Sequence, residues 1–365
     1  MSLALSDMFA ARPCLFFVSL VTLLHQRFAV SRLMIVVIVL MSATFGSGQI
    51  SGHATADASP IPFITRDAAE PLPERYDVLT INKAEFLKTV VEVGQTAVFP
   101  AYTEELLRVK WRPHDPIDVS IVKPSGIAKP PVVLFLYGYG TDPEKFLNQQ
   151  FCATLAGKGF ASVGFQTALT GPRYHDRPLK EWFVSELPES IAASVHDVQL
   201  MIDYLQTRDD LDTRRIGIFG QGSGGAISIL AAAADRRITA VDVMNPWGDW
   251  PDWLEHSPVV PNEERADYVS PAFLEKVKPL DPVRWMDRLA GRPFRLQETL
   301  FDVSVPNEAR KKMRESLPET GQFVSYADLA AYTVNVSRNG RMLDWMQEQL
   351  GISRSGRSDL SVSTK

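Results

Sequence analysis

The stretch Arg215-Ile216-Gly217-Ile218-Phe219-Gly220-Gln221-Gly222-Ser223-Gly224-Gly225 decides the fold of this 365-residue chain. Its apolar run, Ile216–Phe219, has the length and composition of a buried strand. The glycines that follow predict a tight turn, and the small apolar residues after Gly224 predict a helix that packs closely on the strand. The stretch therefore predicts a strand, a sharp turn and a helix, in that order.

Short apolar runs alternate with helical patterns on both sides of this unit. Further strands are expected at Leu107–Trp111, Asp118–Val122, Pro131–Leu136, Ala161–Phe165, Ile238–Met244, Phe294–Gln297 and Gln322–Tyr326. Further helices are expected at Lys83–Val98, Pro143–Lys158, Glu189–Gln206 and Arg341–Leu350. The alternation predicts an α/β fold with a mostly parallel, doubly wound sheet and helices on both faces. Residues 247–289, rich in tryptophan and proline, interrupt it and are expected to form an inserted cap.

The predicted strand, turn and helix resemble the nucleophile elbow of the α/β hydrolases, in the branch of esterases and prolyl-peptidase-like enzymes. The resemblance covers roughly residues 131–350. In the motif G-x-S-x-G, the residues two places either side of the nucleophile must be small, and Gly220 and Gly224 hold those places. The resemblance implies the α/β-hydrolase fold and an activity on acyl esters or peptide bonds.

The nucleophile's own position departs from the family pattern, because Gly222 stands there and Ser223 comes one residue later. A register shifted by one residue would make Ser223 the nucleophile, with Gly225 as a suitable flank. It would also put the long side chain of Gln221 where the turn needs a small one, and Ser223 would point about 100° away. In the family pattern Ser223 instead supplies a backbone N–H to the oxyanion hole. We therefore expect that Gly222 replaces the catalytic serine.

The other two members of a catalytic triad are incomplete as well. The loop Asp302-Val303-Ser304-Val305-Pro306 follows an expected strand and resembles the family's acid loop, so Asp302 is the candidate acid. Its alternative role is to cap the helix that begins near Pro306. No histidine follows His256 in the chain, so none can follow the last strand. His256 in the cap and His175 in a loop are the remaining candidate bases, although each has the simpler interpretation of a surface residue.

A binding pocket can persist without this chemistry. The segment Tyr137-Gly138-Tyr139-Gly140 ends an expected strand at the place where the resemblance puts the oxyanion hole. The backbone N–H of Tyr139 is the candidate donor, and Tyr137, Gly138, Gly222 and Trp247 are the candidate pocket residues. The tryptophans of the cap are expected to wall an apolar pocket.

Three hypotheses for the function follow from these residues. Loss of the serine or the histidine of such a triad costs about 10⁶ in kcat, so the first is a protein that binds a small molecule or a partner without turnover. The second is an active hydrolase of esters or peptides with a rearranged site that uses Ser223, Asp302 and either His256 or His175. The third is an interaction protein of the cell envelope with a vestigial pocket. The sequence holds no metal-binding cluster and no phosphate-binding loop, so we expect no metal or other cofactor.

Composition and the chain ends set the remaining expectations. The net charge of −5 and the absence of a long basic run argue against a nucleic-acid partner. Residues 1–48 hold two apolar runs, too short to span a bilayer, and the second resembles a secretory signal. We therefore expect a secreted, periplasmic or envelope protein, with a retained membrane tether as the alternative.

Residues 49–73 are expected to be a linker, residues 74–352 the hydrolase-like domain and residues 353–365 a disordered tail. Cys152 is expected to be a buried packing residue.

Overall fold

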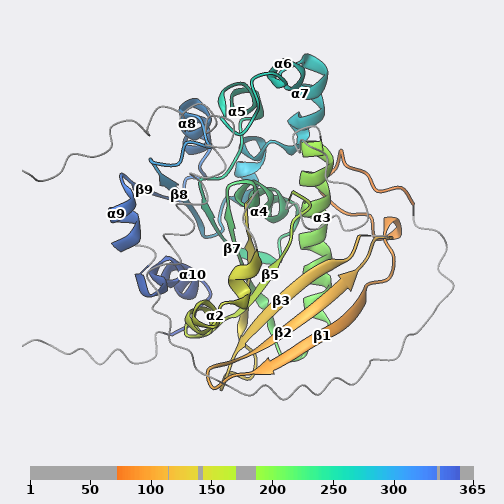
Figure 1. Ribbon diagram of the computed structural model, residues 1–365, viewed down its shortest axis with the longest axis vertical. Helices are drawn as coiled ribbons and strands as arrows, with labels where there is room; N and C mark the ends of the chain where they lie inside the picture. Colours follow the sequence, from red (N-terminus) through yellow and green to blue (C-terminus); the bar gives the residue numbers. More distant parts are fainter. Residues whose placement is uncertain (1–71, 114, 139–142, 170–185, 335–337, 354–365) are drawn as a thin grey trace, which may run out of the picture. The chain divides into compact units, whose positions relative to one another are not determined.

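The computed structural model describes residues 72–113, 115–138, 143–169, 186–334 and 338–353 (Figure 1). The expected leader and nearly all of the expected linker and tail lie outside these ranges, so the domain boundaries and export remain predictions. Over the described ranges, every helix is too short or too polar to cross a bilayer.

The strands of the described part form a single sheet in the order β1-β2-β3-β5-β4-β6-β7-β8-β9. Their bounds are Val90–Val98 (β1), Tyr102–Lys110 (β2), Ile117–Pro124 (β3), Pro131–Leu136 (β4), Ala161–Phe165 (β5), Asp212–Gln221 (β6), Ile238–Met244 (β7), Phe294–Thr299 (β8) and Gln322–Tyr326 (β9). Strands β5, β4, β6, β7, β8 and β9 run parallel, whereas β1, β2 and β3 pair antiparallel with one another and β3 with β5. The prediction of a mostly parallel α/β sheet is confirmed.

The connections between the strands are largely helical. The longer α-helices are α2 (Gln149–Ala156), α3 (Leu187–Gln206), α4 (Ser223–Ala234) and α8 (Asn307–Glu315). The shorter α-helices are α5 (Trp250–His256), α6 (Arg265–Tyr268), α7 (Pro271–Val277), α9 (Leu329–Tyr332) and α10 (Asp344–Gln349). The 3₁₀ helices are η1 (Lys83–Glu85), η2 (Pro143–Leu147), η5 (Lys278–Leu280), η6 (Pro282–Leu289) and η8 (Arg338–Leu343). The expected helices from 143 and from 341 thus each begin with a 3₁₀ turn.

Helices cover both faces of the sheet, and β6 shows why they can pack so closely. Side chains alternate between faces along a strand, so the two glycines of β6 at 217 and 220 lie under different helices. A Cβ on Gly217 would meet the side chain of Met346 in α10, with the methyl carbon at 3.2 Å. A Cβ on Gly220 would meet the first turns of α4. The two helices lie on opposite sides of the sheet, as the sequence predicts (Figure 1).

The expected helix at Lys83–Val98 is wrong. Lys83–Glu85 is a single 3₁₀ turn, and Val90–Val98 is the edge strand β1. The many β-branched residues of β1 favour an extended backbone, and pairing with β2 decides between helix and strand.

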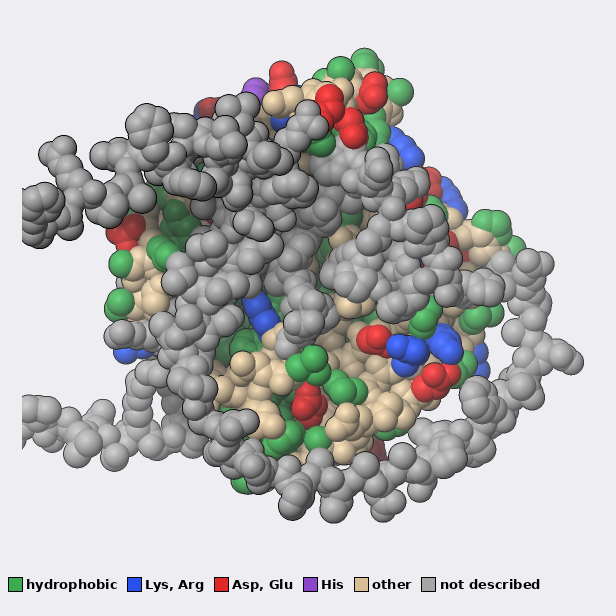
Figure 2. Space-filling model, viewed as in Figure 1, with side chains coloured by type: hydrophobic (Ala, Val, Ile, Leu, Met, Phe, Trp, Pro, Cys, Tyr) green, Lys and Arg blue, Asp and Glu red, His purple; other side chains and the backbone are tan. Residues whose placement is uncertain are grey.

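The ion pairs Arg108–Asp118 and Lys110–Glu92 join neighbouring strands at this edge of the sheet, and Figure 2 shows acidic and basic side chains gathered over one end of β1–β3. Exposed charges of this kind discourage pairing with another sheet.

The expected cap, residues 247–289, joins β7 to β8 and contains α5, α6, α7, η5 and η6. Three of its four tryptophans, Trp247, Trp250 and Trp253, belong to the hydrophobic core. The rings of Trp247 and Trp253 lie 4.4 Å apart, and the indole N–H of Trp250 donates to the carbonyl of Leu280 at 2.8 Å. All three side chains are buried, so they pack this segment into the core of the domain.

Candidate functional site

The turn between β6 and α4 is the centre of the candidate site. Its residue Gly222 has φ +57° and ψ −122°, which ends the strand and starts the helix within one residue. The N–H of Gly222 donates to the carbonyl of Met244 at 3.0 Å. The carbonyl of Gly222 accepts from the backbone N–H of Trp247 at 3.1 Å and of Ala226 at 3.2 Å. Backbone hydrogen bonds therefore hold the turn in place.

Glycines around the turn are required by close backbone contacts. A Cβ on Gly220 would lie 2.6 Å from the carbonyl carbon of Gly224, with the oxygen of that residue closer still. A Cβ on Gly224 would lie 2.9 Å from the carbonyl oxygen of Tyr137, and one on Gly138 would lie 2.8 Å from that of Gln221. Real Cβ atoms do not approach backbone this closely. The turn therefore has the steric signature that the sequence predicts for a nucleophile elbow.

Gly222 differs from these glycines. A Cβ at this position would meet Nε1 of Trp247 at 3.5 Å and Cα of Gly138 at 3.9 Å, which are ordinary van der Waals contacts. The surroundings thus leave room for a side chain at the tip of the turn, and the chain supplies only a hydrogen there. Three of the expected pocket residues, Gly138, Gly222 and Trp247, are brought together at this point.

Ser223, the alternative nucleophile, is the first residue of α4 and is fully buried. It follows the tip of the turn and does not occupy it. Gln221, which a shifted register would place beside the nucleophile, is the last residue of β6 and is half-buried. Gly225 would clash with Pro246 if it carried a Cβ, at 2.9 Å, so it too belongs to the close packing of α4.

The candidate acid and base each have other partners. Asp302 lies in the loop after β8, as predicted, and its carboxylate accepts from the N–H of Ser304 at 2.7 Å and from its hydroxyl at 2.6 Å. This arrangement stabilises the loop that leads into α8. The ring of His256 in α5 lies 2.8 Å from the carboxylate of Asp252, and its side chain is 57% exposed. Each of the two is thus engaged locally, and no contact between them is present in the described part of the chain.

The two remaining sequence candidates, Tyr139 and His175, lie outside the described residues. His196 is buried in α3, where its two ring nitrogens contact the carboxylate of Glu74 at 2.7 Å and the carbonyl of Val78 at 2.9 Å. This histidine holds the segment before β1 against α3.

One contact near the turn, between Tyr137 and Lys145, has no signal in the sequence. Tyr137 packs its ring against Phe146, and the amine of Lys145 lies 5.1 Å from the centre of the Tyr137 ring. Burial raises the pKa of Tyr137 and lowers the pKa of Lys145. The buried Tyr137 hydroxyl has no hydrogen-bond partner among the residues that the structure describes. These groups come together only because η2 folds back over the end of β4.

The described ranges hold no group of three or more His, Cys, Asp or Glu residues that could bind a metal ion.

Cys152 is buried, and its thiol donates to the carbonyl of Phe146 at 3.0 Å. Burial raises the pKa of Cys152 to about 12. The thiol therefore packs and does not act as a nucleophile at neutral pH, as predicted.

Comparison with known proteins identifies the fold. No family model matches the chain. Among solved structures, it is similar to acetyl xylan esterase 1 from Thermoanaerobacterium sp. JW/SL YS485, with a TM-score of 0.58 and 15% identity over 77% of this chain and 96% of the other. It is also similar to an acetyl xylan esterase from Paenibacillus sp. R4, with a TM-score of 0.52 and 18% identity over 66% of this chain and 83% of the other. An acylaminoacyl peptidase from Pyrococcus horikoshii has a TM-score of 0.52 at 15% identity, over 71% of this chain and 46% of the other.

The chain therefore has the α/β-hydrolase fold. At such low identity the likeness establishes the fold, and the function must be argued from the site itself.

Proposed function

We propose that this protein binds a small molecule at the elbow of its α/β-hydrolase fold and does not hydrolyse it through a serine triad. The observation that carries the proposal is Gly222. It occupies the sharp turn where the fold presents its nucleophile, with space for a side chain and none present. Nucleophilic catalysis needs an activated side chain at this point.

The missing base strengthens the proposal. The chain has no histidine after His256, and the ring of His256 is engaged by Asp252 at the surface of α5. Ser223 is buried one residue beyond the tip. Without both serine and base, such a site retains roughly 10³–10⁴ over water, from binding and the oxyanion hole alone.

The names of similar structures suggest the class of ligand. Two are acetyl xylan esterases and one is an acylaminoacyl peptidase. We propose an ester- or peptide-like small molecule, whose carbonyl group would lie near Gly222, Gly138 and the indole N–H of Trp247. The segment 247–289 would then form one side of the site as a cap.

Hydrolysis of short-chain p-nitrophenyl esters and of an N-acetylated amino acid anilide tests the proposal directly. The wild-type protein and Ser223→Ala are expected to show the same background rate. Ser228→Ala is the matched control, because it removes another buried hydroxyl from the same helix. A wild-type rate well above background that is lost in Ser223→Ala and kept in Ser228→Ala would instead establish an active hydrolase with a rearranged site.

Binding is tested separately by thermal unfolding in the presence of the same esters and of acetylated xylo-oligosaccharides. A concentration-dependent rise in Tm without turnover is expected, because a ligand that binds only the folded state stabilises it. No rise with any of these compounds, together with co-purification of an envelope protein, would favour a role in protein interaction instead.

We also propose that the protein is exported, on the basis of the signal-like segment within residues 1–48. Fractionation of cells expressing the full chain and a chain without residues 1–48 tests this. Only the full chain should leave the cytoplasm, and equal retention of both would contradict export.

A further inference from the structure

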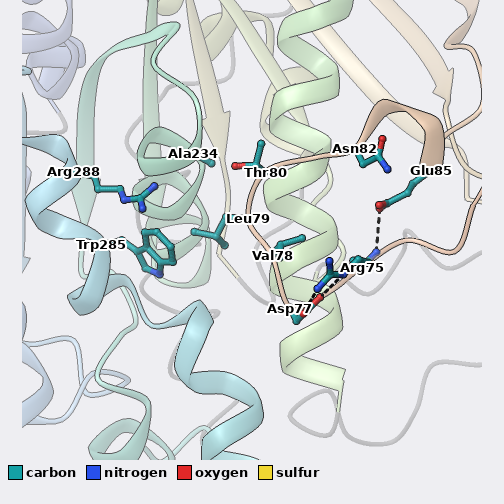
Figure 3. Close-up of a pocket in the computed structure, with 10 residues that line it drawn as sticks. All are labelled: Arg75, Asp77, Val78, Leu79, Thr80, Asn82, Glu85, Ala234, Trp285 and Arg288. Atoms are coloured by element: carbon teal, nitrogen blue, oxygen red, sulfur yellow. Dashed lines mark hydrogen bonds and ion pairs between the residues drawn. The ribbon is translucent and has the colours of Figure 1, made fainter.

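A second site lies at the other end of α4. A cavity of about 500 Å³ opens between the segment Arg75–Glu85 and the 3₁₀ helix η6, with Ala234 at its back (Figure 3). Ala234 is the last residue of α4, whereas the elbow precedes the first. At 1.5 Å per residue, the two ends of this helix are roughly 17 Å apart. A ligand in this cavity would therefore not contact the elbow, and this site goes beyond the proposed function.

The cavity has one cation without a matching acid. The guanidinium of Arg288 lies over the ring of Trp285, 4.5 Å from its centre, and forms no ion pair with the residues that the structure describes. The other cation, Arg75, is held by Asp77 through two hydrogen bonds of 2.5 and 3.1 Å. The backbone N–H of Arg75 donates to Glu85 at 3.1 Å, so both acids of the lining are engaged at the far end.

The groups near Arg288 complete an amphipathic surface. Leu79 is buried beneath the cavity, and the Trp285 ring and Ala234 add apolar surface beside it. Figure 3 shows the Thr80 hydroxyl directed toward the side from which Arg288 extends. A carboxylate between the two would receive charge-assisted hydrogen bonds from the guanidinium and one from the hydroxyl. The apolar body of the same molecule would cover Leu79.

Both walls of the cavity are fixed by interactions behind them. The carbonyl of Leu79 accepts from the side-chain amide of Gln199 in α3 at 2.6 Å, and that of Val78 lies 2.9 Å from the ring of His196. On the opposite wall, the indole N–H of Trp285 donates to the carbonyl of Pro279 at 2.8 Å. A ligand would meet a preformed surface and would lose little free energy in ordering it.

We propose that this cavity binds a small amphipathic carboxylate, with its carboxylate on Arg288 and Thr80 and its apolar body on Leu79 and Trp285. The volume falls within the range of about 300–1,000 Å³ that is usual for small-molecule sites.

Calorimetric titration of the protein with 1-naphthoate tests the charge requirement, with naphthalene-1-carboxamide as the neutral analogue of the same shape. Naphthoate should bind and the carboxamide should bind at least about tenfold more weakly, because a hydrogen bond to a charged group is lost. Equal binding of the two compounds, or no binding of naphthoate, would overturn the proposal.

Two variants, Arg288→Gln and Ala234→Met, locate the site. Arg288→Gln should weaken naphthoate binding about tenfold or more, and Ala234→Met should abolish it by filling the back of the cavity. The control is Arg284→Gln, which changes an exposed arginine of the same 3₁₀ helix outside the cavity and should leave binding unchanged. If Arg288→Gln and Ala234→Met bind naphthoate as well as the wild type, the carboxylate lies elsewhere and the site is refuted. Neither result depends on whether the elbow binds or hydrolyses an ester.

Discussion

The elbow makes a quantitative prediction about two glycines that are two residues apart. Gly222→Ala should be tolerated and Gly220→Ala should not. At position 222 the new methyl group meets its nearest neighbour at 3.5 Å, so the cost comes from the backbone alone. At position 220 the methyl group would lie 2.6 Å from the carbonyl carbon of Gly224 and still closer to two oxygen atoms, one of them in the backbone of α4.

The magnitudes follow from these contacts. With φ +57° and ψ −122°, position 222 lies outside the left-handed helical region, and an alanine held there bears backbone strain of about 1–3 kcal/mol. The reduced freedom of the unfolded chain returns about 0.4–1 kcal/mol. Gly222→Ala should therefore destabilise the protein by about 1–2 kcal/mol. Gly220→Ala must push α4 away from the sheet, at the upper end of the cost of overpacking or beyond it, about 3 kcal/mol or more. In a domain of this size, each kcal/mol lowers Tm by roughly 2–4 °C.

Chemical denaturation in urea, with thermal unfolding as a second measurement, separates the two variants. A change in the midpoint without a change in the slope shows that the stability itself has changed. The reasoning is refuted if Gly222→Ala is as destabilising as Gly220→Ala, because position 222 would then have no room for a side chain. Gly222→Ser should match Gly222→Ala in stability, since the two differ only in a hydroxyl group.

Three further predictions concern buried charges and the thiol. Arg295→Met should destabilise the protein by about 3–5 kcal/mol in urea titrations. The substitution leaves the Asp242 carboxylate buried without the guanidinium that binds it at 2.7 and 3.0 Å. Adding Asp242→Asn should recover much of the lost stability. Burial alone would raise the pKa of Glu74, but hydrogen bonds from Arg112 and His196 lower this pKa overall. The ionised Glu74 carboxylate therefore stabilises the folded protein fully above the ordinary pKa of 4.5, and this contribution disappears as the pH falls through the lower pKa of the folded state. Urea titrations at pH 7 and pH 3 should thus show a larger gap between wild type and Glu74→Gln at the higher pH, and an equal gap would contradict this. Cys152 should react with iodoacetamide only in denaturant, as followed by mass spectrometry, because its thiol is buried with a raised pKa.

Pro131–Leu136, Ala161–Phe165 and Ile238–Met244 are mostly apolar and end at turn residues, and their predicted bounds agree with β4, β5 and β7. The predicted bounds of β9 agree as well, although this strand is largely exposed. The edge strand β1 lacks the apolar signal because most of its side chains are exposed, so its pattern resembles that of a surface helix. Only its pairing with β2 identifies it as a strand.

The close packing of the turn between β6 and α4 was predictable because its requirements are local. Gly220 and Gly224 lie close together in the sequence, and each has the same steric reason to be glycine in any protein with this turn. The Tyr137–Lys145 contact and the cavity beside Arg288 were not predictable. They join segments whose approach depends on the packing of η2, α4 and η6, and no spacing in the sequence encodes that approach.

The construction of the turn at Gly222 is compatible with the proposed absence of a nucleophile. The turn is held by the bonds from Gly222 N–H to Met244 and from Trp247 N–H to the Gly222 carbonyl, and neither involves a side chain at position 222. Glycine adopts the positive φ of this turn without the strain that serine would bear. Replacing the catalytic serine by glycine would therefore remove the reaction while leaving the turn at least as stable. The surrounding groups that recognise a ligand, from the end of β4 to Trp247, would be kept in position, which is the physical basis for expecting binding without turnover.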